Sequence, residues 1–278
     1  MATIKEVAEE MQNRYPEAEV IVKEVEKVNG TRTGLSILQN GENIAPCIYL
    51  DPERIAEQDA ETVCDGLQRA YENNKPDFSK TDILALREWE NVADKVKIRV
   101  INKGWNGAYL EGKPHTEIDD LAVMYYIDLG TNETAGLMTV AVNDFFMGQW
   151  DIDKETLHAA AMANTAKGAV VRTIASVMDD AGFPPVPEDA CPMYVCSNAS
   201  RNLGGGVVLA IMESLRERFG TFWILPSSIH ETIIVPSSAV DDREQLDALV
   251  NCVTLTQVEK DERLGTHAYF SEDMRVAV

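Results

Sequence analysis

The stretch Ser227–Glu231 places serine, histidine and glutamate, the residue types of a hydrolase triad, close together in the chain. In such a triad a base activates the nucleophile and an acid orients the base. Neighbouring residues of a strand point to opposite faces, so Glu231 could not orient His230. Catalysis would need Cys196 or Ser197 as the nucleophile and an acid from another element. These residues are weak catalytic candidates, and the pattern favours a structural turn in which serine hydroxyls or a backbone carbonyl bind the His230 ring.

Asn198–Gly206 is a glycine-rich segment between an expected strand and an expected helix. Phosphate-binding loops combine such glycines with backbone N–H groups that converge on an anion at the start of a helix. This segment has neither the P-loop spacing nor the dinucleotide-binding spacing, and no lysine follows its glycines. The sequence therefore predicts a tight turn and no bound cofactor.

His115, with Glu117, Asp119 and Asp120 close behind it, has the residue types of metal ligands. Metal sites need three or four ligands that converge in space, and this cluster fits equally well a loop that precedes a strand. His267 has no potential partner near it in the sequence. We therefore predict no metal site.

The charge of the chain is strongly acidic, with 25 basic and 46 acidic residues and a net charge of −21. The excess is even: 18 basic residues oppose 32 acidic ones up to Phe183, and 7 oppose 14 after it. An even acidic excess repels nucleic acid and anionic lipid and favours partners with a basic surface. We therefore expect no direct binding of nucleic acid.

The cysteines and the hydropathy pattern predict a cytoplasmic protein. An odd number of cysteines, five, without a basic and apolar leader at the start, indicates free thiols in a reducing compartment. Cys191 and Cys196 have poor spacing for zinc and no second pair. No stretch approaches eighteen apolar residues, so no membrane span is expected.

The N-terminal part is expected to form a helix and a three-stranded meander. Thr3 and Glu6 have the capping-box spacing, and apolar residues at helical spacing follow them up to Tyr15. Asn-Gly pairs, a strong hairpin signal, then separate three apolar runs. The expected strands are Val20–Val28, Leu35–Leu38 and Ile44–Leu50, all antiparallel, with the Leu35 strand in the middle.

The rest of the chain is expected to be α+β, with antiparallel or mixed sheets, packed helices and two subdomains. Three prolines in Phe183–Asp189 indicate a linker, which divides the chain into domains 1–183 and 190–278. Before the linker we expect helices at Ala60–Tyr71, Ile83–Val92, Asp153–Asn164 and Val170–Met178, and strands at Val96–Val100, Leu121–Leu129 and Leu137–Val142. After it we expect a strand (Met193–Ser197), one helix from Val208 to Phe219, a hairpin (Thr221–Pro226 and Ile229–Val235), a helix opened by Asp241, and a strand at His267–Phe270.

Several segments resemble one bacterial family of domains of unknown function, DUF5688, which is common in anaerobic Gram-positive bacteria of the gut. These segments are Gly34–Ile37, Gly41–Leu50, Asp120–Val123, Met193–Asn198, Phe222–Pro236, Thr256–Val258 and His267–Phe270. The resemblance covers nearly the whole chain. The family name implies no activity that could be carried over to a residue.

Three functions remain open on the sequence alone. The favoured hypothesis is an accessory protein that acts by protein–protein contact, without catalysis, on a partner with a basic surface. The first alternative is a hydrolase of a small molecule or peptide that uses His230 or Cys196. The second alternative is an acidic inhibitor of a nucleic-acid-binding enzyme.

Overall fold

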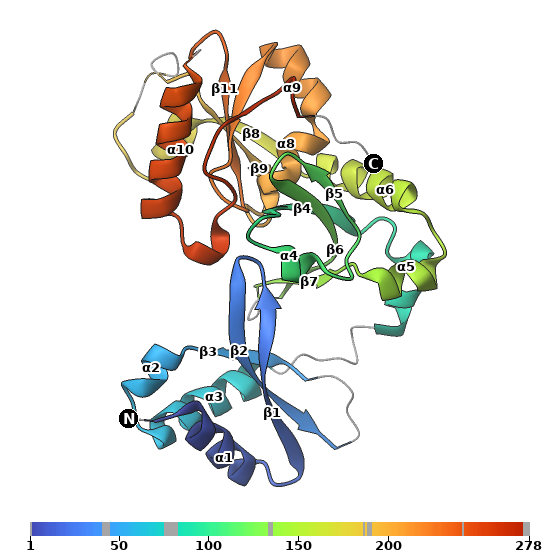
Figure 1. Ribbon diagram of the computed structural model, residues 1–278, viewed down its shortest axis with the longest axis vertical. Helices are drawn as coiled ribbons and strands as arrows, with labels where there is room; N and C mark the ends of the chain where they lie inside the picture. The colour runs from blue at the N-terminus through green and yellow to red at the C-terminus, as the bar shows by residue number, and fades with distance from the viewer. Residues whose placement is uncertain are drawn as a thin grey trace. The chain divides into compact units, whose positions relative to one another are not determined.

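The computed structural model describes residues 2–40, 45–74, 83–132, 136–185, 187, 191–240 and 242–274. The chain forms two compact units. The first comprises Met1–Ile83 with Thr131–Gly136, and the second comprises Leu84–Gly130 with Leu137–Val278. Helices and three antiparallel sheets make up the described residues, so the expected α+β class is confirmed (Figure 1).

The first unit is a three-stranded sheet with two helices on one face. Its elements are α1 (Ile4–Arg14), β1 (Ala18–Lys27), β2 (Gly30–Gln39), β3 (Cys47–Leu50), α2 (Pro52–Ala56) and α3 (Ala60–Asn74). The expected capping box is present, because the Thr3 side chain accepts from the N–H of Glu6 while the Glu6 carboxylate accepts from the N–H of Thr3. The strand order β1-β2-β3 confirms that the Leu35 strand is central. Gly41 and Ile44, at the expected second turn, lie outside the described residues.

The core of the first unit explains why this arrangement forms. Leu35 and Ile37 on β2 point to one face of the sheet and are fully buried. Met11 of α1 and Cys64 of α3 are also fully buried in the same cluster. The two helices contact each other and cover this face of the sheet (Figure 1). Burial of these apolar side chains is the main force that holds the unit together.

The second sheet lies around a long central strand. Its elements are β4 (Val96–Asn102), β5 (His115–Ile118), β6 (Leu121–Asn132) and β7 (Gly136–Ala141), with α4 (Gly107–Leu110), α5 (Asp144–Trp150) and α6 (Lys154–Lys167) beside them. β6 pairs with β4, β5 and β7, so it is the central strand, whereas β7 pairs only with β6 among the described strands. Asp153 caps α6 as expected, through a hydrogen bond from the N–H of Thr156. Of a turn expected at Thr131–Glu133 between the strands Leu121–Leu129 and Leu137–Val142, Glu133 lies outside the described residues.

The third sheet has the order β12-β10-β11-β9-β8, and every pair in it is antiparallel. Its elements are β8 (Ala169–Thr173), α7 (Ile174–Asp180), β9 (Tyr194–Asn198), α8 (Val207–Ala210), α9 (Met212–Phe219), β10 (Phe222–Leu225), β11 (Thr232–Pro236), α10 (Arg243–Gln257) and β12 (Tyr269–Phe270). α10 packs on one face of this sheet, where Leu246 and Val250 meet Trp223, Leu225 and Val235 (Figure 1). No described helix has the length and apolar character needed to cross a bilayer.

Two expected helices take a different form. The expected helix at Ile83–Val92 is a pair of 3₁₀ turns, η1 (Ile83–Arg87) and η2 (Trp89–Asn91). The expected helix from Val208 to Phe219 is interrupted at Ile211, whose φ and ψ of −118° and 21° are not helical. The start expected at Asp241 lies outside the described residues, and Asp242 caps α10.

The segment Val170–Met178 was expected to be helical, and this was wrong. Residues Ala169–Thr173 form β8, and only the part after Thr173 is helical, with the Thr173 hydroxyl accepting from the N–H of Ser176. The β-branched Val170 and Val171 suit a strand, and they pair with Ser197 and Cys196 of β9.

This pairing also bears on the domain division. β8 precedes the proline-rich segment and β9 follows it, so one sheet continues across 183–190. Along the chain, the first compact unit ends at Ile83 and the second begins at Leu84. The domain boundary expected within 183–190 stays a prediction.

We predict that Asn164→Ala destabilises the second unit. The Asn164 amide of α6 donates to the carbonyl of Ala93 at 2.8 Å and to that of Val96 at 3.0 Å, which joins the helix to β4. Loss of a buried donor should lower the free energy of unfolding by about 1–3 kcal/mol, measured by urea denaturation. Gln257→Ala, at the exposed end of α10, is the control and should change it by less than about 0.5 kcal/mol. Equal effects of the two variants would contradict this role.

Candidate functional site

Gly204–Gly206 forms a 3₁₀ turn at which three backbone segments meet. The N–H of Gly205 donates to the carbonyl of Ile229 at 3.0 Å. A Cβ atom on Gly204 would lie 2.6 Å from the carbonyl oxygen of His230, and one on Gly206 would lie 3.0 Å from a methyl of Val100. The glycines are therefore required by close packing, which agrees with the tight turn expected from the sequence. Because the Gly205 N–H is already bound, the turn does not present converging donors to an anion.

His230 lies in the loop before β11, and its ring has two partners. The N–H of Leu203 donates to Nδ1 at 3.1 Å, and Nε2 lies 3.4 Å from a carboxylate oxygen of Glu262. Since Nδ1 accepts, the proton of the neutral ring sits on Nε2 and faces Glu262. The expected ring partners were serine hydroxyls or a carbonyl. The Ser228 hydroxyl instead accepts from the backbone N–H of His230.

Ser197 and Cys196 are neighbours on β9, so their side chains point to opposite faces of the sheet. The Ser197 hydroxyl donates to the backbone carbonyl of His230 at 2.7 Å and not to its ring. Cys196 is fully buried, and burial raises the pKa of its thiol to about 12. The thiol is therefore protonated at neutral pH. The structure brings Ser197 and His230 together through the backbone, but it gives neither nucleophile a base.

Asp119, Asp120 and His267 form a cluster that joins the second and third sheets. Their potential ligand atoms lie within 4.8 Å of one another. Among the described residues, these three form a group of residue types that could hold a metal ion. The Nε2 atom of His267 lies 3.8 Å from an oxygen of each aspartate. His115 is not part of this group, since its Nδ1 lies 2.8 Å from the carbonyl of Lys113. The sequence did not indicate this cluster because His267 is far from the aspartates along the chain.

Hydrogen bonds around Asp120 account for this arrangement without a metal. One oxygen of Asp120 accepts from the Tyr269 hydroxyl at 2.6 Å, and the other accepts from the Asn102 amide at 2.9 Å. Burial raises the pKa of Tyr269, and the hydrogen bond to Asp120 raises it further, so the phenol stays neutral and donates. The donor set Asp-Asp-His is of a type that binds divalent cations. Both oxygens of Asp120 are nevertheless engaged, and the bonds it makes tie the start of β6 to β12.

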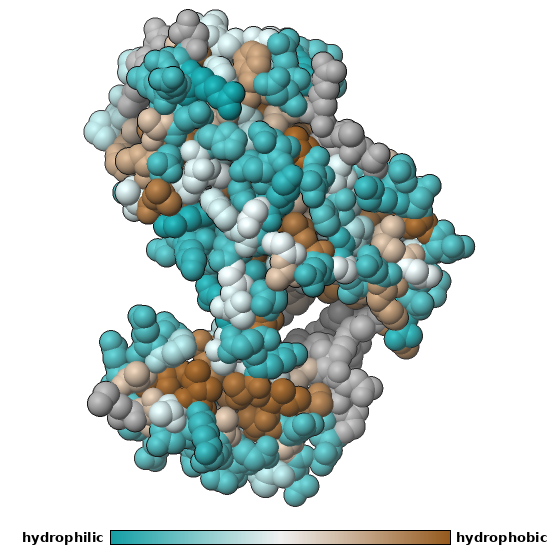
Figure 2. Space-filling model, in the orientation of Figure 1, coloured by the Kyte–Doolittle hydropathy of each residue, from teal (hydrophilic) through white to brown (hydrophobic). Residues whose placement is uncertain are grey.

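A groove runs between α10 and the third sheet, with a volume of about 190 Å³. Its helix wall includes Leu249 and Val253, which are 44% and 36% exposed. Its sheet wall includes Leu225, Pro226 and Ile233. Apolar atoms come to the surface over α10 in the space-filling view (Figure 2). An apolar side chain that remains this exposed beside a groove is typical of a protein-binding surface.

The comparison with protein families gives one match. The model of a family of unknown function, DUF5688, matches residues 2–272. The chain belongs to DUF5688. No curated protein and no solved structure matches the chain.

Membership of DUF5688 confirms the resemblance carried by the sequence segments, and it assigns no activity to any residue. In this DUF5688 chain the serine, histidine and cysteine that could have formed a hydrolase site bind backbone groups or are buried. The candidate binding surface is the groove beside α10, and the catalytic motifs in the sequence did not indicate it. Its signal in the sequence was the apolar Leu249 and Val253 on the same helix as the buried Leu246 and Val250.

We predict that Gly204→Ala destabilises this DUF5688 protein. Its new methyl group would lie 2.4 Å from the Ser197 hydroxyl and 2.6 Å from the His230 carbonyl, and the backbone would have to shift. The expected loss is about 1–3 kcal/mol of unfolding free energy, measured by thermal and urea unfolding. Gly148→Ala in α5 is the matched control, because a Cβ there meets nothing within 4 Å. A loss at Gly204 no larger than at Gly148 would show that the turn is not packed this tightly.

We also predict selective alkylation of the cysteines. Iodoacetamide at pH 8 should modify the exposed Cys252 and spare Cys196, since only the thiolate reacts and the Cys196 pKa is raised to about 12. Mass spectrometry before and after unfolding in urea measures this difference. Because the folded pKa lies above the ordinary value of 9.0, Cys196 should stabilise the fold below pH 9 and lose that contribution as the pH rises further. Rapid modification of Cys196 in the native protein would reveal an accessible thiolate.

Proposed function

We propose that this DUF5688 protein is an accessory protein that binds another protein through the groove beside α10, without catalysis of its own. The observation that carries the proposal is the two-sided apolar character of α10. The helix buries Leu246 and Val250 against the sheet, yet it also leaves Leu249 and Val253 exposed along the groove. An amphipathic or extended segment of a partner can place apolar side chains in a groove of this kind.

The charge around the groove supports a basic partner. Within Asp242–Arg263, which spans α10 and the turn after it, six carboxylates stand against three basic side chains. The groove itself is lined by uncharged residues. A partner segment with apolar side chains at its centre and lysine or arginine at its ends therefore fits this surface, and opposite charges also speed association. The net charge of −21 supports the same preference and a cytoplasmic protein that does not bind nucleic acid directly.

The two alternatives have less support. A hydrolase would need a base beside Cys196 or Ser197, whereas the His230 ring is bound to Leu203 and faces Glu262. An acidic inhibitor of a nucleic-acid-binding enzyme shares the requirement for a basic partner. It would bind through carboxylates alone, and the apolar groove would have no part in it.

We predict that Leu249→Glu weakens partner binding. Peptides selected from a displayed random library on the native protein should carry apolar residues flanked by lysine or arginine. Their affinity, measured by fluorescence anisotropy, should fall at least about tenfold for Leu249→Glu, because a buried unpaired charge costs more than 1.4 kcal/mol.

Leu255→Glu is the matched control. Leu255 is 52% exposed on the same helix and does not line the groove, so this variant should change the affinity by less than about twofold. Two results would contradict the proposal: selected peptides without basic flanks, or peptides that bind both variants equally well. Peptides that bind by lysine and arginine alone would favour the inhibitor hypothesis.

A further inference from the structure

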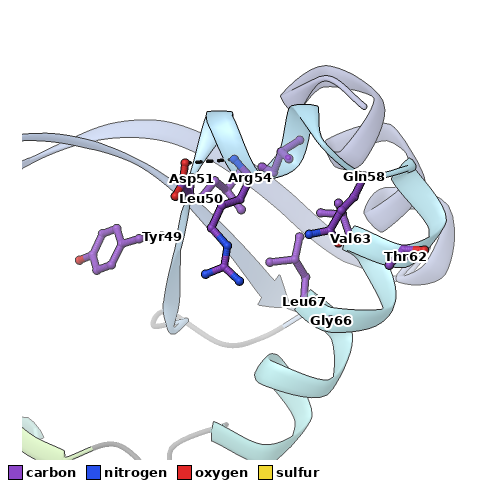
Figure 3. A pocket seen from close by; sticks show the side chains of 10 residues that line it. Tyr49, Leu50, Asp51, Arg54, Gln58, Thr62, Val63, Gly66 and Leu67 are labelled. Atoms are coloured by element: carbon purple, nitrogen blue, oxygen red, sulfur yellow. Dashed lines mark hydrogen bonds between the residues drawn. The ribbon is translucent and has the colours of Figure 1, made fainter. Parts of the chain in front are cut away.

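The first unit contains a hollow of about 210 Å³ between β3, α2 and α3 (Figure 3). Its apolar surface is formed by Leu50, Ile55, Val63 and Leu67. Leu50 and Ile55 belong to the buried core of the unit, and Val63 and Leu67 pack against that core and stay partly exposed. The core of the unit therefore opens to solvent at this point, and Figure 2 shows a broad apolar area on this unit.

One cation lines the hollow and has no carboxylate partner among the described residues. Arg54 lines it, and its guanidinium makes no ion pair with any described residue. The Lys27 ammonium stands over the ring of Tyr49, 4.6 Å from its centroid, and likewise has no carboxylate partner in the described chain. The carboxylate that lines the hollow, Asp51, accepts from the backbone N–H groups of Glu53 and Arg54 instead (Figure 3). The Arg54 guanidinium at the hollow is therefore available to pair directly with an anionic group of a ligand.

A glycine keeps the hollow open. Gly66 lies in the interior of α3, where glycine is less favourable than alanine. Its φ is not in the left-handed region, and a Cβ atom there would meet nothing within 4 Å, so neither backbone conformation nor packing requires glycine. Gly66 lines the hollow, and a Cβ atom at this position would lie in open space (Figure 3).

We infer that this hollow binds a small amphipathic carboxylic acid. Its apolar body would lie against Leu50, Val63 and Leu67, and its carboxylate would pair with the Arg54 guanidinium, which can bind both oxygens. The side-chain amide of Gln58 extends toward Leu67 and adds a hydrogen-bond donor (Figure 3). The volume is below the roughly 300–1,000 Å³ of sites for drug-sized ligands, so the ligand is small. This site lies in the other unit from the α10 groove and is independent of the function proposed above.

Calorimetric titration of the full-length protein with octanoate tests this inference. We expect saturable binding at millimolar or lower concentration, and at least about fivefold weaker binding of octanol, which has the same chain but no charge. Arg54→Gln should weaken octanoate binding at least about fivefold and leave octanol binding unchanged. Gly66→Leu should remove the binding of both compounds, because its side chain fills the hollow.

Arg69→Gln is the matched control, since Arg69 is an exposed arginine on α3 that does not line the hollow. It should change octanoate affinity by less than about twofold. Thermal unfolding of each variant shows whether the first unit remains folded, and Arg54→Gln tests the site even if Gly66→Leu does not fold. Absence of octanoate binding to the unmodified protein, or equal effects of Arg54→Gln and Arg69→Gln, would overturn the inference.

Discussion

The close approach of backbone at Gly204–Gly206 is the constraint on which the larger unit depends. A Cβ atom at each of these positions would lie 3.0 Å or less from a neighbouring atom, and the neighbours come from β9, from the loop before β11 and from β4. The absence of side chains at these three positions therefore lets the turn lie directly against β9, the loop before β11 and β4. The turn leads directly into α8, which places Val207 and Val208 in the buried interior. This junction also decides where the polar residues around it must lie.

A buried junction of this kind needs polar side chains as hydrogen-bond partners for its backbone. These side chains are of the same residue types that occur in active sites. Backbone N–H and C=O groups removed from water must find partners. The Ser197 hydroxyl binds the His230 carbonyl, the His230 ring accepts from the N–H of Leu203, and the carbonyl of Ile229 accepts from Gly205. Ser197 and His230 lie close together because they form hydrogen bonds with the backbone groups that meet at the Gly204–Gly206 turn. In the sequence, these residue types resemble the catalytic triad of a hydrolase.

Local patterns in the sequence predict much of this fold, whereas features made by distant segments are not predictable from it. The capping box at Thr3 and the hairpin at Asn29, whose φ is 63°, follow from residues within a few positions. Val170–Met178 is an apolar run too short for its periodicity to separate strand from helix, and only pairing with β9 decides it. The Asp120 to Tyr269 bond joins residues far apart in sequence. The hollow beside Gly66 is likewise invisible in the sequence, because it consists of space that three elements leave unfilled.

The distribution of unpaired charge gives the two units opposite preferences, although the net charge of the chain is uniformly acidic. Arg14 pairs with Asp65, and Arg172 pairs with Asp180. Arg54 has no carboxylate partner among the described residues, and the carboxylate ligand proposed for the hollow would pair with it directly despite the net charge of −21. Around α10 the carboxylates outnumber the cations, and the groove there attracts a basic segment. Since Coulomb interactions of exposed groups are screened beyond about 8–10 Å, each ligand responds to the local charge and not to the total. The carboxylate site and the basic-partner groove proposed above are therefore compatible within one acidic chain.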